Sequence, residues 1–434
     1  MRQFLILCVL FSCNYAIGQG QIEFVEYDLS NGLHVILHQK KKNPIVAVTM
    51  LYHVGSKNED PKRTGFAHFF EHLLFEGSEN ILRGEYAKYV QNAGGTYNAN
   101  TSADRTFYYE LLPSNQLELG LWLESERLMH AKIDDEGIKT QREVVKEERR
   151  QRVDNTPYGS ILEEVLKRAY KKHPYQWTTI GSLSHLNSAK KEEFINFYKT
   201  FYVPNNATLS IAGDIDIDKT KKLIEQYFGE IDRGVGDIPR PSIVEPEMDK
   251  EVKGSVNDNI FLPAVVHAFK IPEQGSDDFY AVEMLGNLLS SGKSSRIYRA
   301  VVEQQEKAVQ VQVIPLSFED PGLALTFSIA SRGTNVDDLN DAIDAEYAKV
   351  RNELVSEREF QKLKNEIENR KLSSMNSVAG IAEALANYHT YFGDANLVNS
   401  EIERYMKVTR EDLKRVANKY FIESNRVRLF YLPN

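Results

Sequence analysis

The sequence has little cysteine. Its two cysteines, Cys8 and Cys13, lie within the first thirteen of 434 residues. We expect this segment to be removed, which leaves a chain that can form neither a disulfide nor a cysteine-ligated zinc site. An excess of basic charge is also missing, because the net charge is −9 at pH 7. Such a chain lacks the basic surface that binding to a phosphate backbone requires, which excludes nucleic acid as a partner.

Long apolar runs are absent as well, except at the N-terminus, so we expect no integral membrane segment in the processed chain. The first residues contain one early cation, Arg2, then an apolar run over residues 4–12, and then small residues up to Gly20. This pattern is typical of a secretory signal.

We expect the signal peptide to occupy residues 1–20, with cleavage after Gly18 or Gly20. Export across the inner membrane then predicts a periplasmic protein. A lipid anchor on Cys13 is a minor alternative, because Phe11 is bulky where lipoprotein signals carry a smaller residue.

The processed chain is longer than one ordinary domain, and a stretch rich in glycine and proline interrupts it at about 233–247. Strands and helices alternate on both sides of this stretch. We therefore expect an N-terminal domain over residues 21–235, a linker over 236–247 and a C-terminal domain over 248–434.

The order of expected elements in the first half recurs in the second. A helix in "GFAHFFEHLLFEG", a hairpin in "GGTYNANTSADRTFYYELLP" and a helix over 134–152 correspond to "DDFYAVEMLGNLLSSG", "VQVQVIPLSFEDPGLALTFSIA" and "SEREFQKLKNEIENRKL". Other elements expected in the first half are strands in "GLHVILHQ" and "PIVAVTMLYHVG" and helices at 83–93, 115–130 and about 217–229. The repeat predicts an α+β chain of two homologous α/β-sandwich-like domains, each a mostly antiparallel sheet covered by helices.

The segment "HFFEH" places polar side chains on an apolar helix of the first half only. Residues four apart share one face of a helix, so His68 and His72 can direct their imidazole nitrogens at one metal ion, and Glu71 borders that face. A zinc site that keeps a position open for water needs a third protein ligand and a nearby base. Glu71 can supply the base. Candidates for the third ligand, all within "QREVVKEERR", are Glu143, Glu147 and Glu148.

Such a motif rarely arises by chance in a chain that has only ten histidines. Two imidazoles and a carboxylate on an apolar helix would also be costly to bury without a partner. An incidental polar cluster at a helix surface is the competing interpretation. The remaining histidines are isolated in the sequence, and we interpret each as structural or surface: His34, His38, His53, His130, His173, His185, His267 and His389.

The sequence resembles the inverzincin metallopeptidases of the pitrilysin, insulin-degrading enzyme and mitochondrial processing peptidase type. The resemblance covers essentially the whole processed chain and rests on "HFFEH", "GGTYNANTSADRTFYY" and "QREVVKEERRQRVDNTPYG", in that order. The family's glutamate ligand follows its motif by some 75 residues, and 75 positions separate His72 from Glu148 here. The resemblance thus implies Glu148 as the third ligand, with Glu147 as the alternative.

The resemblance implies one Zn²⁺ per chain, held by His68, His72 and Glu148. Glu71 is then the general base for the water that the metal activates. Relatives often carry a further glutamate two helical turns before the third ligand, where it supports the site from outside. Gln141 stands at that position, so the tuning of the site differs.

"GGTYNANTS" resembles the edge strand on which such enzymes bind an extended peptide, and Asn98 and Ala99 occupy the family's Asn-Ala positions. Backbone pairing on such a strand gives affinity with little demand on the peptide sequence. An ordinary hairpin strand is the competing interpretation.

Members of the family also use an arginine and a tyrosine from the half that lacks zinc, and these residues help to bind the substrate. Alignment of "SSRIY" with the family's similar run places Val302 and Val309 at the two positions, so both groups are missing. Bacterial and mitochondrial relatives of this size commonly pair a zinc-bearing chain with a similar chain that lacks zinc. We expect such a heterodimer, in which each chain forms half of a substrate chamber and the partner supplies the arginine and tyrosine.

The resulting prediction is a periplasmic zinc endopeptidase that acts on short or unfolded peptides as the catalytic subunit of a heterodimer. The alternative is a non-catalytic chamber or scaffold subunit that binds zinc and extended peptides. The intact set of His68, Glu71, His72 and Glu148 favours the enzyme.

Overall fold

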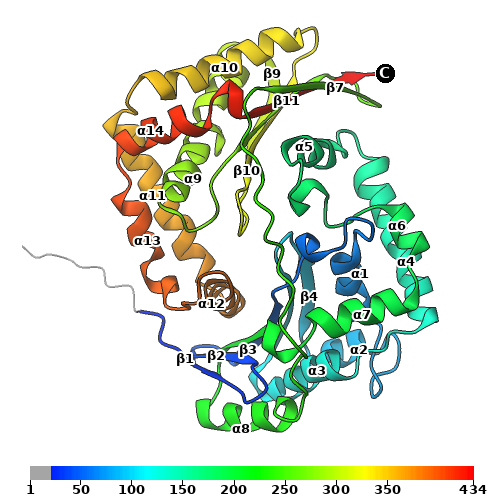
Figure 1. Ribbon diagram of the computed structural model, residues 1–434. Coiled ribbons are helices and arrows are strands. Elements are labelled where there is room, and N and C mark those ends of the chain that lie inside the picture. Colours follow the sequence, from blue (N-terminus) through cyan, green and yellow to red (C-terminus); the bar gives the residue numbers. More distant parts are fainter. Residues whose placement is uncertain (1–20) are drawn as a thin grey trace, which may run out of the picture.

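The computed structural model describes residues 21–434, so the expected signal peptide, its cleavage positions and Cys13 lie outside the described residues. Two sheets, each covered by helices, lie one above the other (Figure 1). Within the described part of the chain, no helix is both long and apolar enough to cross a membrane.

The first sheet has the strand order β1-β2-β6-β3-β5-β4. Its strands are β1 (Val25–Asp28), β2 (His34–Gln39), β3 (Ile45–Tyr52), β4 (Thr96–Thr101), β5 (Thr106–Pro113) and β6 (Ala207–Gly213). Neighbouring strands are antiparallel except β2 and β6. Strand β4 pairs only with β5 and forms one edge of the sheet.

The second sheet has the strand order β7-β11-β8-β10-β9. Its strands are β7 (Val252–Asp258), β8 (Ala264–Lys270), β9 (Ala308–Leu316), β10 (Leu323–Ala330) and β11 (Arg426–Pro433). Only β7 and β11 are parallel. This order matches β2-β6-β3-β5-β4 of the first sheet strand for strand, which confirms the predicted α+β class and the predicted pair of similar, mostly antiparallel sheets.

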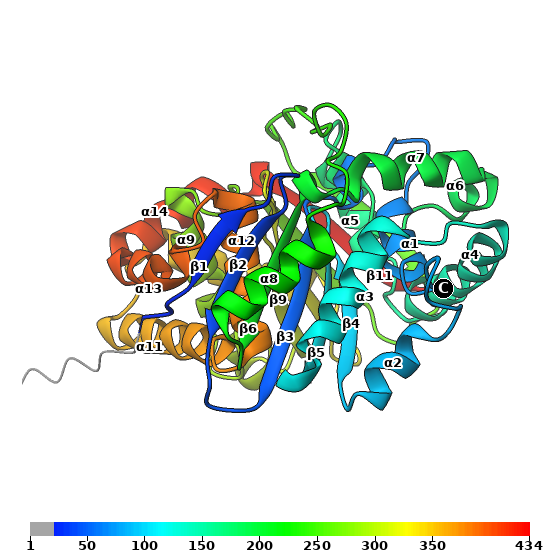
Figure 2. The same ribbon diagram turned by 90° about the horizontal axis from the view of Figure 1, so that it is seen from below.

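Eight helices of the described first half precede six of the second. They are α1 (Phe66–Leu73), α2 (Tyr86–Asn92), α3 (Leu117–Met129), α4 (Asp135–Arg149), α5 (Ile161–Ala169), α6 (Leu183–Ser188), α7 (Lys191–Phe201), α8 (Ile217–Phe228), α9 (Asp277–Ser290), α10 (Val336–Asn352), α11 (Glu357–Ser374), α12 (Val378–Phe392), α13 (Leu397–Lys407) and α14 (Arg410–Tyr420). Helices α3 and α8 cross the strands of the first sheet (Figure 2). The helix expected from residue 83 begins only at Tyr86, because Gly84 takes a left-handed φ of 75°.

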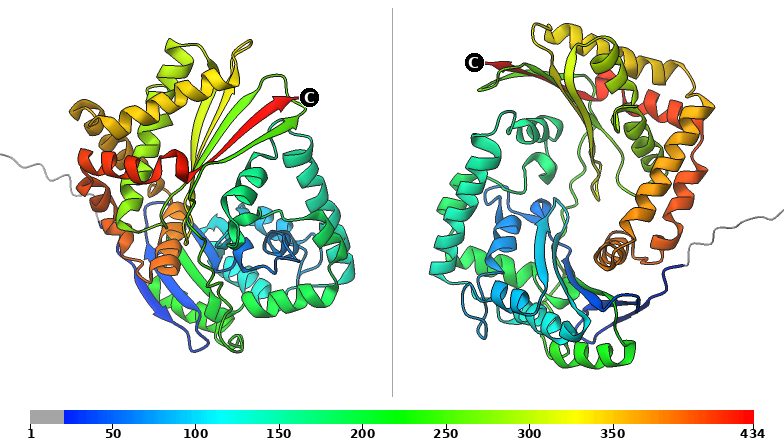
Figure 3. Two further views of the ribbon diagram at one scale, coloured as in Figure 1. Left: turned by 45° about the horizontal axis from the view of Figure 1, so that its top comes forward. Right: turned by 180° about the vertical axis from the view of Figure 1, so that it is seen from behind.

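Each half contributes a helix to the sheet of the other half. Helix α12 lies against the first sheet (Figure 3), and its Ile381 and Leu385 pack with Ile36 of β2. Helix α5 lies against the second sheet, where Val165 packs on Val266 of β8. The exchange was not predicted from the sequence. Residues 236–247 contain no helix or strand, and the domain bounds at 235 and 248 stay a prediction.

Candidate metal centre

Helix α1 carries the "HFFEH" segment and has a firmly held start. It follows Gly65, whose φ of 98° lies in the left-handed region that favours glycine. The Glu59 carboxylate accepts hydrogen bonds from the backbone N–H groups of Gly65 and Ala67 at 2.8 and 2.9 Å. These bonds satisfy donors at the helix start that have no partner within the helix.

One face of α1 is aromatic, and this face sets the rotation of the helix about its axis. The Phe66 ring stacks on Phe194 at 4.5 Å between ring centroids, and Phe70 stacks on Phe197 at 5.6 Å. The Tyr108 hydroxyl of β5 donates a 3.0 Å hydrogen bond to the Phe70 carbonyl. Because these rings are buried in the first core, the polar residues of the motif face α4 and β4 instead.

Helix α4 supplies the third member of the site. Its N-terminus is capped by Asp134, whose carboxylate accepts a 2.8 Å hydrogen bond from the Gly137 N–H. Val145 is fully buried beside α1, which orients this part of the helix. Three residues later, one turn further, Glu148 reaches the two histidines of α1.

The nitrogen and oxygen atoms of His68, His72 and Glu148 form a near-regular triangle. The two Nε2 atoms lie 3.2 Å apart, and Glu148 Oε2 lies 3.4 Å from His68 Nε2 and 3.1 Å from His72 Nε2. Zinc bonds of about 2.0–2.1 Å in tetrahedral geometry separate neighbouring ligand atoms by about 3.3 Å. The Glu148 Oε2 atom is buried and accepts no hydrogen bond from residues 21–434. The three residues therefore fit a zinc ion and leave room for a fourth ligand.

The charge states of these groups also suit a cation. Burial, and then the neighbouring His72, lower the pKa of His68 to about 4, so its ring is neutral at pH 7. The His72 ring, whose Nε2 atom lies 3.1 Å from Glu148 Oε2, lowers the pKa of Glu148. Metal binding requires neutral imidazole and ionised carboxylate, and both are in the required state at neutral pH.

Glu71 lies beside this triangle and is held by β4. The Thr101 hydroxyl donates a 2.7 Å hydrogen bond to Glu71 Oε2. Burial raises the pKa of Glu71, which is the direction that suits a general base. Sequence reasoning missed Thr101, although its alternation with Tyr97 and Ala99 places it on the half-buried side of β4.

A second residue that sequence reasoning missed is Arg152. It lies in a wide helical turn over Arg150–Asp154 that continues α4, and its Nη1 atom is 2.6 Å from Glu148 Oε1. The Arg152 side chain is otherwise exposed, at 75%. It places a cation beside the Glu148 carboxylate. The run "EERRQR" gave no sign of which arginine would do so.

The structure separates Glu148 from the alternative ligand, Glu147. The Glu147 side chain is 53% exposed and pairs with Arg150 and Gln151 on the outer face of α4. Gln141 also lies away from the triangle, because its amide donates a hydrogen bond to Glu76.

Other residues singled out in the sequence lie outside the triangle. Asn98 and Ala99 lie in the middle of the edge strand β4, with Asn98 exposed. Val302 packs against the second core, and Val309 on β9 is 53% exposed. Arg296, which precedes Val302 by six residues, pairs with Glu359 at 2.9 Å.

Family models match both halves of the chain. Residues 34–182 match the model described as insulinase (peptidase family M16), and residues 188–367 match the model described as peptidase M16 inactive domain. The triangle and Glu71 lie within the first match.

Full-length relatives agree with these matches. The chain is 29% identical to zinc protease PqqE of Helicobacter pylori, over 93% of this chain and 92% of that protein. It is 26% identical to the probable mitochondrial-processing peptidase subunit beta of Schizosaccharomyces pombe, over 90% of this chain and 87% of that protein.

Solved structures share the fold. A crystal structure of a protease from Helicobacter pylori has a TM-score of 0.91 and 28% identity, over 95% of this chain and all of that chain. The periplasmic protease PqqL from Escherichia coli has a TM-score of 0.77 at 17% identity, over 95% of this chain and 48% of that chain, and shares the fold alone.

Proposed function

The chain belongs to peptidase family M16, and from this premise we propose that it is a zinc-dependent endopeptidase. The observation that carries the proposal is the triangle of His68, His72 and Glu148, whose atoms lie 3.1–3.4 Å apart, with Glu71 beside it. Side chains that served only in packing would not leave a buried carboxylate oxygen, here Glu148 Oε2, without a hydrogen bond.

The residues of the chain divide the chemistry of peptide hydrolysis among themselves. His68, His72 and Glu148 would hold a zinc ion, which would supply a Lewis acid to make water more acidic and to polarise the scissile carbonyl. Glu71 takes the proton of the attacking water and passes it to the leaving amine. Thr101 holds the Glu71 carboxylate in one orientation through its hydrogen bond.

Strand β4 gives the substrate class. Its outer edge has no neighbouring strand in the described chain, so an extended peptide can add to the sheet beside Asn98 and Ala99. Thr101 at the end of the same strand touches the base. Peptide bonds laid along β4 therefore pass close to the triangle, which favours short or unfolded peptides over folded proteins.

The proposed setting is a periplasmic heterodimer. The expected signal peptide supports export, and valines at positions 302 and 309 leave the chain without the arginine and tyrosine of related sites. A homologous chain without zinc ligands would supply them from the facing half of the chamber. Activity of this chain mixed with such a paralogue should exceed the activity of either chain alone, and equal activity of this chain by itself would refute partner dependence.

A non-catalytic zinc-binding scaffold is the second candidate, because the same two valines remove part of the machinery that stabilises a transition state. The substitution Glu71→Gln distinguishes the two. For an enzyme, it should lower kcat/KM on an unfolded peptide by about 10²–10⁴-fold with zinc content unchanged. Glu143→Gln, on the exposed face of α4, is the matched control. A rate unaffected by Glu71→Gln would reject Glu71 as the base.

A further inference from the structure

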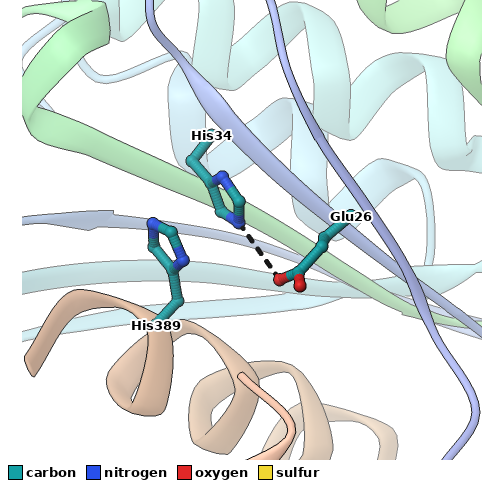
Figure 4. A group of neighbouring side chains, drawn as sticks. All are labelled: Glu26, His34 and His389. Atoms are coloured by element: carbon teal, nitrogen blue, oxygen red, sulfur yellow. Dashed lines mark ion pairs between the residues drawn. The ribbon is translucent and has the colours of Figure 1, made fainter. Parts of the chain in front are cut away.

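A second cluster of metal-ligand side chains joins the two halves of the molecule. Glu26 of β1, His34 of β2 and His389 of α12 converge at one point, and each offers an atom within 4.8 Å of the other two (Figure 4). The His34 and His389 rings are stacked, with centroids 3.3 Å apart. More than 350 residues separate them in the sequence.

The cluster continues an apolar contact between α12 and the first sheet. Ile381, Leu385 and His389 follow one another at intervals of four along α12, so they share one face. The first two pack on Ile36, and His389 meets His34 two residues before Ile36 on the same side of β2. The packing of α12 on β2 is apolar at the neighbouring positions, so a pair of apolar residues would be expected where His34 and His389 lie.

The contacts of His34 fix which of its nitrogens is free. Asp28 lies directly opposite His34 in the β1–β2 ladder, and His34 Nδ1 donates a 2.8 Å hydrogen bond to Asp28 Oδ1. A metal-binding histidine typically gives its second ring N–H to a carboxylate in this way. In the neutral ring, the lone pair is then on Nε2.

The Nε2 atom of His34 is buried and has no hydrogen-bond partner in the described chain. His34 as a whole is 9% exposed. Its Nε2 atom points at Glu26 Oε2, 3.4 Å away (Figure 4). A lone pair and a carboxylate oxygen that face each other repel unless a proton or a metal ion lies between them.

We propose that Glu26, His34 and His389 bind a divalent transition-metal ion such as Zn²⁺, separate from the ion of the catalytic triangle. Two imidazoles and one carboxylate are a common ligand set for such ions, with water in the remaining position. The partly exposed Glu26 side chain leaves the site open to solvent. Asp28 acts as a positioning residue, because it holds the His34 ring without reaching the ion.

Ion binding requires one movement. An imidazole lone pair lies in the plane of its ring, so no ion can lie in the planes of two rings stacked at 3.3 Å. His389 is the ring that turns, since no hydrogen bond from residues 21–434 holds it, whereas Asp28 holds His34. The bound ion then ties α12 to β1 and β2 and fixes the second half of the chain on the first sheet.

Metal binding to the full-length chain tests the proposal. In a His68→Ala/His72→Ala background, which removes the catalytic triangle, we expect one Zn²⁺ per chain by equilibrium dialysis and elemental analysis. Co²⁺ added to the same variant should give visible absorption bands of a nitrogen- and oxygen-ligated ion. Adding His34→Gln or His389→Gln should abolish both signals. Asp28→Asn should weaken binding by about 10–100-fold.

His38 gives a matched control. It lies on the same strand, is 8% exposed, and also has a buried Nε2 atom without a partner, but it belongs to no ligand cluster of the described chain. His38→Gln should leave binding intact. Glu26→Gln changes an exposed side chain, so its loss of binding cannot be ascribed to misfolding. Absence of Zn²⁺ from the His68→Ala/His72→Ala chain, or binding that survives His34→Gln, would overturn the proposal.

Discussion

Thr101 Oγ1 lies 2.7 Å from Glu71 Oε2 and donates a hydrogen bond to it, so the edge strand of the first sheet directly contacts the carboxylate proposed as the base. The contact links the proposed peptide-binding strand β4 to the proposed base on α1. A peptide that pairs with β4 reaches the strand whose last residue orients Glu71. Binding of the peptide and orientation of the base therefore depend on the same strand.

Thr101→Val keeps the shape of the side chain and removes the hydroxyl. The Glu71 carboxylate then loses its orienting donor, and we expect kcat to fall by about 10–100-fold with little change in KM. Thr101→Ser retains the hydroxyl and should keep most of the activity. Steady-state kinetics on an unfolded peptide measures both variants, and equal rates for wild type and Thr101→Val would show that the bond does not orient the base.

Glu148→Gln removes the charged oxygen from the triangle while keeping its size. A neutral amide is a poor zinc ligand, so we expect the zinc dissociation constant to rise by at least about tenfold and activity to fall with it. Glu147→Gln changes the neighbouring, 53% exposed glutamate and should bind zinc as wild type does. Competition with a chromophoric chelator measures both affinities. If Glu147→Gln weakened zinc binding more than Glu148→Gln, the third ligand would be Glu147.

Asp320 links the loop between β9 and β10 to the first half, at 3.3 Å from both Lys57 Nζ and His173 Nε2. The close contact with His173, helped by the charge of Lys57, lowers the pKa of Asp320 from 3.8 to about 2. A carboxyl group whose pKa is lower in the folded chain stabilises it above the unfolded value and loses this effect as the pH falls toward the folded value.

Asp320→Asn should therefore lower Tm above about pH 4, and the difference from wild type should shrink as the pH falls from 4 toward 2. Thermal unfolding followed by circular dichroism across this range measures the difference. Asp249→Asn, an exposed aspartate outside the contact, should give no such trend. A difference that stays constant with pH would contradict the role given to the Asp320 charge.

Arg127 of α3 is fully buried beneath α1 and pairs with Glu124 and, at 3.7 Å, with Glu110. Its guanidinium also lies 4.2 Å from the centroid of the Tyr108 ring. Arg127→Met leaves buried carboxylates without a counter-charge, so we expect the free energy of unfolding to fall by about 3–5 kcal/mol. Adding Glu124→Gln should restore part of the loss. Denaturant unfolding measures both, and a loss below about 1 kcal/mol would mean that the pair behaves like a surface ion pair.

The sequence predicted the parts of the fold that depend on local pattern. Apolar periodicity located helices such as α1, α3 and α8, and the repeat predicted two similar, mostly antiparallel sheets. The resemblance to a known family, through its spacing from motif to ligand, pointed to His72 and Glu148, and the structure brings this pair to 3.1 Å because α4 passes beside α1.

Contacts between distant segments could not be predicted in this way. His34 and His389 looked like isolated histidines because nothing near either one shows that α12 crosses onto the first sheet. Thr101 was overlooked because its hydroxyl gains a role only when β4 lies next to α1. In both cases the missing information was the packing of elements, which a single sequence does not encode in any short motif.

Because α5 and α12 each cover the sheet of the other half, the order of synthesis limits when each sheet can be covered. The last strand of the first sheet ends at Gly213, yet the helix that covers one of its faces begins at Val378. A chain that leaves the ribosome or crosses a membrane from its N-terminus thus carries an uncovered apolar face until its last quarter arrives. The first half therefore cannot cover this face of its sheet alone.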